Sequence, residues 1–245
     1  MEFTSRTRSI IMFLVLLSAF VIGGAFAPLG SAWGGVVTPS SVIRTAKLAI
    51  ARQTSAHVVF VAHAGSPSKT ETIVADVGRT SGTEAVTEGT AALAIRLSPS
   101  YAYVSGNSSG LTTLFGMSSA DAKKVGKDWE SWKAGTSQYA NLKSYLTMSS
   151  VSALLPKAKG TKLTTVVTGG TTSYVLKWSI SATSSTPEVA NSLMVSSGAV
   201  TLPVKETALI ANGAKATTTV SRWGEQFDVG VPPITATIAS SKITG

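Results

Sequence analysis

The side chains best suited to chemistry in this sequence are its two histidines, His57 and His63, which stand six residues apart. In an extended strand they would share a face with Val59 and Val61, and six strand residues span roughly 20 Å. That separation is too large for two ligands of one metal ion. We therefore interpret both histidines as ordinary strand residues and predict no metal site.

The motifs of common enzyme classes are also missing from the sequence. It contains no HExxH pair, no Gly-rich phosphate loop and no GxSxG elbow. The absence of cysteine excludes disulfides, thiolate metal ligands, cysteine nucleophiles and an acylated N-terminal cysteine. Serine and threonine are so abundant that a chance Ser/His/Asp trio carries no meaning. We expect a non-enzymatic protein with no catalytic residue and no cofactor.

What the sequence offers instead is large apolar side chains at positions where helices would cover a sheet. Leu111, Leu114 and Phe115 are spaced i, i+3, i+4, as on one face of a helix that ends at Gly116. Side chains of this kind could bury acyl chains at about 0.8 kcal/mol per methylene. Alternatively they fill a closed core, because helix-on-sheet packing gives the same pattern. The candidate cavity residues are Leu111, Leu114, Phe115, Leu142, Tyr145, Leu146, Leu154, Tyr174, Leu176 and Trp178.

The elements that would position these side chains form two groups of strands around a helical insertion. A helix is predicted over residues 42–53, after a loop that can cap it. Alternating runs bounded by turn residues predict strands over 57–64, 70–77, 80–88, 91–97, 101–105, 161–168, 173–181, 195–200, 204–210 and 216–222. Helical patterns over 111–115, 118–125, 138–147 and 150–155 separate the two groups, with an extended segment at 126–132.

The N-terminus has the pattern of a secretory leader. Arg6 and Arg8 precede an apolar run, and small residues before Trp33 fit a cleavage site, so residues 1–32 are predicted to be a signal peptide. The apolar run extends to about Leu29, which leaves a retained membrane anchor as the alternative. In either case residues 33–245 are expected to form one domain outside the cytoplasm.

The charge balance argues against a nucleic-acid partner. Charged residues make up 13% of the 245, against about 25% in an average soluble domain, and the net charge is +9. The densest basic cluster is Lys123, Lys124 and Lys127, without the interleaved aromatics of a nucleic-acid site. We attribute the positive charge to solubility and to attraction toward anionic surfaces.

Several short motifs, in this order, resemble the actinobacterial branch of the LolA-like lipoprotein-carrier family, the LppX/LprG type. They are AYVSGNSSGLTTLFG from Ala102, then Lys127-Asp128-Trp129, Leu202-Pro203-Val204 and Ser221-Arg222-Trp223-Gly224. The likeness covers roughly residues 40–230. It implies an α+β fold, a half-open antiparallel β-barrel whose concave face is covered by helices, with an apolar cavity between them. The chain departs from the family in lacking the acylated cysteine.

The sequence and the resemblance together predict a carrier of acylated lipid or glycolipid. We expect a monomer that is secreted or anchored in the cell membrane by an uncleaved N-terminal helix. The alternative is an extracytoplasmic protein-interaction or sensor domain with a filled core and no lipid cargo.

Overall fold

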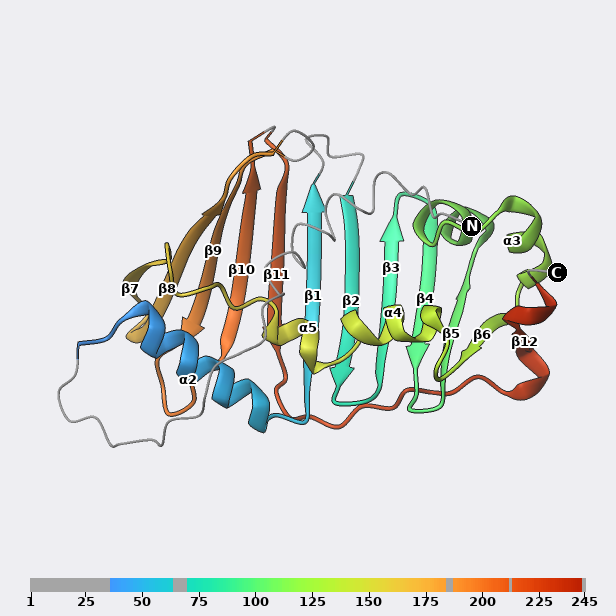
Figure 1. Ribbon diagram of the computed structural model, residues 1–245, viewed down its shortest axis with the longest axis horizontal. Helices are drawn as coiled ribbons and strands as arrows, with labels where there is room; N and C mark the ends of the chain where they lie inside the picture. The colour runs from blue at the N-terminus through green and yellow to red at the C-terminus, as the bar shows by residue number, and fades with distance from the viewer. Residues whose placement is uncertain (1–35, 64–69, 184–186, 212, 244–245) are drawn as a thin grey trace.

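The computed structural model describes residues 36–63, 70–183, 187–211 and 213–243, so the predicted leader lies outside the described part of the chain. Within that part, twelve strands form one unclosed sheet in the order β12-β6-β5-β4-β3-β2-β1-β11-β10-β9-β8-β7 (Figure 1). The strands are β1 (Ser55–His63), β2 (Thr70–Gly78), β3 (Gly82–Glu88), β4 (Ala91–Leu97), β5 (Tyr101–Gly106), β6 (Trp129–Lys133), β7 (Lys162–Thr168), β8 (Thr171–Ile180), β9 (Val189–Ser196), β10 (Pro203–Ile210), β11 (Lys215–Ser221) and β12 (Thr237–Ala239).

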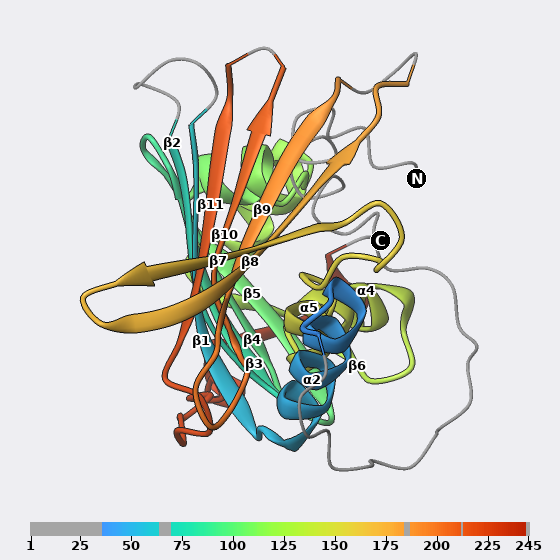
Figure 2. The same ribbon diagram turned by 90° about the vertical axis from the view of Figure 1, so that its left-hand side faces the viewer.

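The sheet consists of two meanders joined along one seam. Strands β1 to β6 each pair with the next in sequence, as do β7 to β11, and all these pairs are antiparallel. The seam pairs β1 with β11, from His57 opposite Ser221 to His63 opposite Lys215. Only the short β12 runs parallel to its neighbour, β6. Figure 2 shows that the β7–β8 hairpin lies across the end of the curved sheet.

The helices cover one face of this sheet, which we call the inner face; the opposite one is the outer face (Figures 1 and 2). The longest helix begins at a capping box formed by Thr38 and Ser41, with proline at its first position. None of the helices in the described segments has the length and apolar character needed to span a bilayer. The helices are α2 (Pro39–Arg52), α3 (Ser119–Val125), α4 (Ser137–Tyr145), α5 (Met148–Ser152), the π-helix η1 (Gly110–Leu114) and the 3₁₀ turns η2 (Ile234–Ala236) and η3 (Ser240–Lys242).

The core between helices and inner face is divided into clusters along the sheet. The largest lies over β3 to β6, where η1 supplies Leu111 and Leu114, α4 supplies Leu142, and α3 supplies Ala122 and Val125. A second joins α5 to β1, β2 and β11, and a third lies under the first half of α2, against β8 and β9. The predicted α+β architecture, an unclosed antiparallel sheet with helices over one face, is confirmed.

Two local predictions need correction. The strand predicted over 195–200 is wrong, because β9 runs from Val189 to Ser196 and the chain then turns. Its inner positions include the polar Asn191, which interrupts the apolar alternation that would have revealed the strand. The helix predicted over 111–115 is a π-helix, in which the Phe115 amide donates to the Gly110 carbonyl at 3.1 Å.

Candidate ligand-binding site

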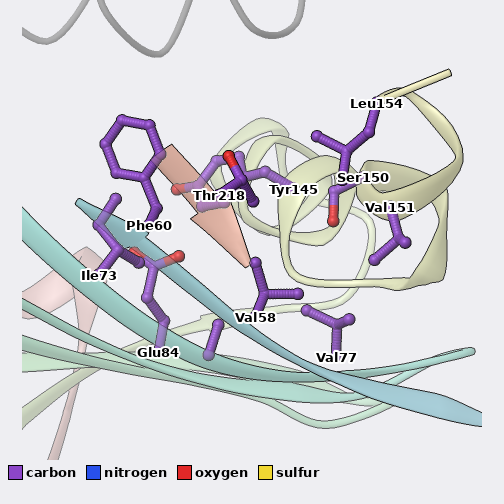
Figure 3. A pocket seen from close by; sticks show the side chains of 11 residues that line it. Val58, Phe60, Ile73, Val77, Glu84, Tyr145, Ser150, Val151, Leu154 and Thr218 are labelled. Carbon is purple, nitrogen blue, oxygen red and sulfur yellow. The ribbon is translucent and has the colours of Figure 1, made fainter. Parts of the chain in front are cut away.

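An apolar pocket lies on the inner face where the two meanders meet (Figure 3). Its volume is about 110 Å³. The sheet side consists of Val58, Phe60, Ile73, Ala75, Val77, Glu84 and Thr218, and the helical side of Tyr145, Ser150, Val151 and Leu154.

Strand pairing brings the sheet side together. Phe60 lies opposite Ile73 on β2 and opposite Thr218 on β11, while Val58 lies opposite Ala75. Paired residues of neighbouring strands point to the same face, so these side chains form one surface. The pocket therefore depends on the seam, because Thr218 is about 160 residues from β1 in sequence.

The α4–α5 segment forms the roof of the pocket. Tyr145 ends α4, Val151 lies in α5, and Leu154 follows it. Between the two helices the backbone rests directly on β3, since a Cβ atom on Gly82 would lie 2.3 Å from the Leu146 carbonyl oxygen. Thr147 fixes this connection, because its hydroxyl donates to the Lys143 carbonyl at 2.9 Å.

The inner face also carries buried carboxyl groups. Glu206 lies in a cross-strand row between Leu193 and Thr218 and is 5% exposed. Burial raises the pKa of Glu206 to about 7, although a hydrogen bond from the Thr218 hydroxyl at 3.5 Å partly lowers it. Burial, with the nearby charge of Asp121, likewise raises the pKa of Glu130 to about 7.

One further carboxyl group lies in the pocket. Glu84 lines the pocket itself, and its side chain points toward Phe60 and Ile73 (Figure 3). None of the lining residues is a lysine, arginine or histidine. The pocket can therefore take an uncharged apolar chain, and it offers no cation to an anionic group.

The structure distributes the ten residues predicted from the sequence over three places. Tyr145 and Leu154 line the pocket. Leu176 is buried in the cluster under α2, with Tyr174 and Trp178 packed against it. The remaining five belong to the large cluster over β3 to β6: Leu111, Leu114, Phe115, Leu142 and Leu146. Of these five, only Phe115 is partly exposed.

Sequence reasoning missed the sheet side of the pocket. Val58 and Phe60 alternate with Val59 and Val61, so both faces of β1 read as apolar. The pattern of β1 alone does not distinguish its inner face from its outer face. Only the patterns of the neighbouring strands could have identified the inner face.

His57 and His63 lie toward opposite ends of β1, on its outer face. Nδ1 of His57 is 2.8 Å from a carboxylate oxygen of Asp76, and the Arg222 guanidinium reaches the same nitrogen. His63 instead contacts the Thr70 hydroxyl at 3.0 Å. In the described residues no three potential ligands gather around a metal position.

Comparison with known proteins gives structural likenesses only. No family model matches the chain, and no curated protein matches it. Among solved structures, the Mycobacterium tuberculosis lipoprotein LppX is similar with a TM-score of 0.48 and 16% identity, over 78% of this chain and 97% of that one. LprF from Mycobacterium bovis gives 0.48 and 12%, over 79% and 96%.

A DUF1329 family protein from Desulfovibrio piger gives a TM-score of 0.31 and 9% identity, over 80% of this chain and 96% of that one. The sequence motifs resemble the same LppX type that these structures include. Likenesses at this level carry no statement about function, which must come from the pocket itself.

Proposed function

We propose that this protein is a non-enzymatic carrier that binds the acyl chain of a lipid or glycolipid in the pocket at the seam. The observation that carries the proposal is the pocket's chemistry: apolar side chains from β1, β2 and the α4–α5 roof, with no basic residue among them. Each methylene that enters would gain about 0.8 kcal/mol. We also propose that it works outside the cytoplasm as a monomer, either secreted or anchored by residues 1–32.

The size of the pocket sets how a lipid would enter. Pockets for small molecules usually measure about 300–1,000 Å³, whereas this one holds about 110 Å³. That space admits a few methylene groups at the end of a chain. A longer chain requires the α4–α5 roof to separate from the sheet, which would open the pocket toward Tyr145 and Leu154. We propose that the remaining predicted residues meet cargo only in such an open form.

The first test is native mass spectrometry of protein purified from a lipid-containing host. The carrier predicts reproducible adducts with the mass of an acylated lipid. Protein that is bare under conditions preserving known lipid complexes would contradict the carrier and favour an interaction or sensor domain with a filled core. Intact mass in the same experiment shows whether residues 1–32 are removed.

A pair of variants on one strand tests the location. Val58→Trp places an indole in the pocket, and we expect it to reduce the lipid-bound fraction at least tenfold. Val59→Trp makes the same change at a similarly half-buried position on the outer face and should leave that fraction unchanged. Equal lipid binding by both variants would place the cargo elsewhere, and circular dichroism melts check that both fold.

A further inference from the structure

Four lysines project from the outer face of the second meander. Lys162, Lys177, Lys205 and Lys215 are all exposed, on β7, β8, β10 and β11. The single acidic residue within strands β7 to β11 is Glu206, and it points inward. Among the ion pairs of the described residues, none includes any of these lysines. Within strands β7 to β11 this face therefore carries positive charge and no acidic side chain.

Two of the lysines are held side by side by the strand register. Lys162 lies directly opposite Lys177 in the β7–β8 pair. Like charges directly opposite each other destabilise a sheet. An anion placed between the two ammonium groups would remove that repulsion, so the pair favours occupation by negative charge.

The same pair borders a hollow of about 780 Å³ on this face. Ser179, Ser192 and Thr207 contribute hydroxyl groups to its lining. Hydroxyl and ammonium groups can both donate hydrogen bonds to phosphate oxygens. The hollow is thus suited to an anionic, oxygen-rich group such as a phosphate ester.

Exposed aliphatic side chains accompany this charge. Leu209, which lines the hollow, is 52% exposed, and Val166, on the same face near the tip of the β7–β8 hairpin, is 38% exposed. Cations beside exposed aliphatic groups match a bilayer surface, where headgroups meet acyl chains. A free polyanion would gain nothing from Leu209 and Val166.

We infer that the outer face of β7–β11, with the β7–β8 hairpin tip, docks the protein on membranes that carry anionic phospholipid headgroups. The inference goes beyond the proposed function, because docking by this face requires no lipid in the pocket at the seam. The two sites lie on opposite faces of the sheet, so cargo could enter or leave while the outer face holds the membrane.

Binding of the full chain to vesicles tests the inference. The partition coefficient is measured for vesicles of phosphatidylcholine with phosphatidylglycerol and for vesicles of phosphatidylcholine alone. Any insertion of residues 1–32 that is common to both vesicle types cancels in the comparison. Each lysine near an anionic surface contributes about 1 kcal/mol, so K162Q/K177Q should weaken the anionic part of the partition coefficient about thirtyfold. K162R/K177R keeps the charge and should bind as the wild type does.

Controls separate this face from net charge and from the pocket. K123Q/K127Q removes two exposed lysines at the other end of the sheet and should reduce binding several-fold less than K162Q/K177Q. Val58→Trp, which blocks the pocket, should dock normally, so failure of the carrier hypothesis leaves this test intact. Equal loss in K162Q/K177Q and K123Q/K127Q would overturn the proposal, as would lysine-dependent binding of polyphosphate without binding to vesicles.

The orientation can be measured because the chain contains no cysteine. A polarity-sensitive dye on Val166→Cys, which lies on the same face as Lys162, should shift to the blue when anionic vesicles are added. The same dye on Ala134→Cys, an exposed position just after β6, should not respond. A response at Ala134 without one at Val166 would show that another face meets the membrane.

Discussion

At the scale of single residues, Glu206 is a group whose ionisation is linked to the fold. Its carboxyl lies between Leu193 and Thr218 on a buried row, where the charged form is costly. Its pKa is raised from 4.5 in the exposed group to about 7 in the folded protein. The folded chain therefore holds a proton over a pH range in which the unfolded chain has already released it.

The sign of the pH dependence follows from that difference. Between pH 4.5 and 7 the unfolded state ionises first, so the free energy of unfolding falls by up to about 1.4 kcal/mol per pH unit as pH rises. Glu206→Gln removes this penalty. Between pH 4.5 and pH 8 we expect the free energy of unfolding of the wild type to fall by up to ~3 kcal/mol more than that of the variant. Urea unfolding at both pH values measures it.

The matched control is Glu225→Gln, an exposed glutamate just after β11. The free energy of unfolding of this variant should depend on pH as that of the wild type does. If Glu206→Gln showed the same pH dependence as the wild type, the carboxyl would not be the group that titrates.

Gly110 is a second residue on which the fold depends. A Cβ atom there would lie 1.9 Å from the Ala92 carbonyl oxygen on β4, so η1 can pack against the sheet only with glycine at this position. We expect Gly110→Ala to lower the free energy of unfolding by ~1–3 kcal/mol through overpacking. Gly198→Ala, where a Cβ meets nothing within 4 Å, should be neutral or slightly stabilising. Chemical unfolding of both variants checks this, and equal effects would contradict it.

At the scale of elements, the C-terminal tail closes the first meander. β12 extends the sheet beyond β6, and Ile243 after η3 is 1% exposed within the large cluster. On its way the tail crosses Arg96, whose guanidinium stacks 4.4 Å over the Trp129 ring and donates to the Gly230 carbonyl. The tail is thus part of the core.

Two isoleucines of the tail test this role. Ile243→Ala should cost ~2–5 kcal/mol, as expected for a buried isoleucine, and expose the edge of β6. Ile234→Ala, at a side chain that is 92% exposed, should change the free energy of unfolding by less than ~0.5 kcal/mol. Thermal melts measure both, and a negligible effect at Ile243 would mean that the tail is only loosely attached.

The sequence could predict most elements because their patterns are local. The alternating strands of the first meander and the capped helix after Thr38 were recovered within a few residues. β12 was missed because three residues are too few for a pattern, and β9 because Asn191 interrupts its apolar face. The floor of the pocket was missed for another reason: it needs Thr218 beside Phe60, a pairing that no local pattern records.

At the scale of the whole molecule, the two faces of one sheet divide the proposed work. The inner face holds apolar residues and buried carboxyls under the helices, and the outer face of the second meander holds unpaired lysines. The small volume of the pocket means that cargo binding and movement of the α4–α5 roof must occur together. The same sheet can remain rigid throughout, since its ladder is continuous from β7 to β12.

The seam between β1 and β11 also governs the order in which the chain can fold. Each meander can form from neighbouring strands, but β1 lacks its second partner until Ser221 has emerged, 164 residues after His57 (221 − 57). At typical synthesis rates that interval is roughly 8 to 33 s. During it the apolar strand with Val58 and Phe60 is an open sheet edge, prone to pair with other chains. The strand that later holds the pocket is therefore open to mispairing with other chains while synthesis continues.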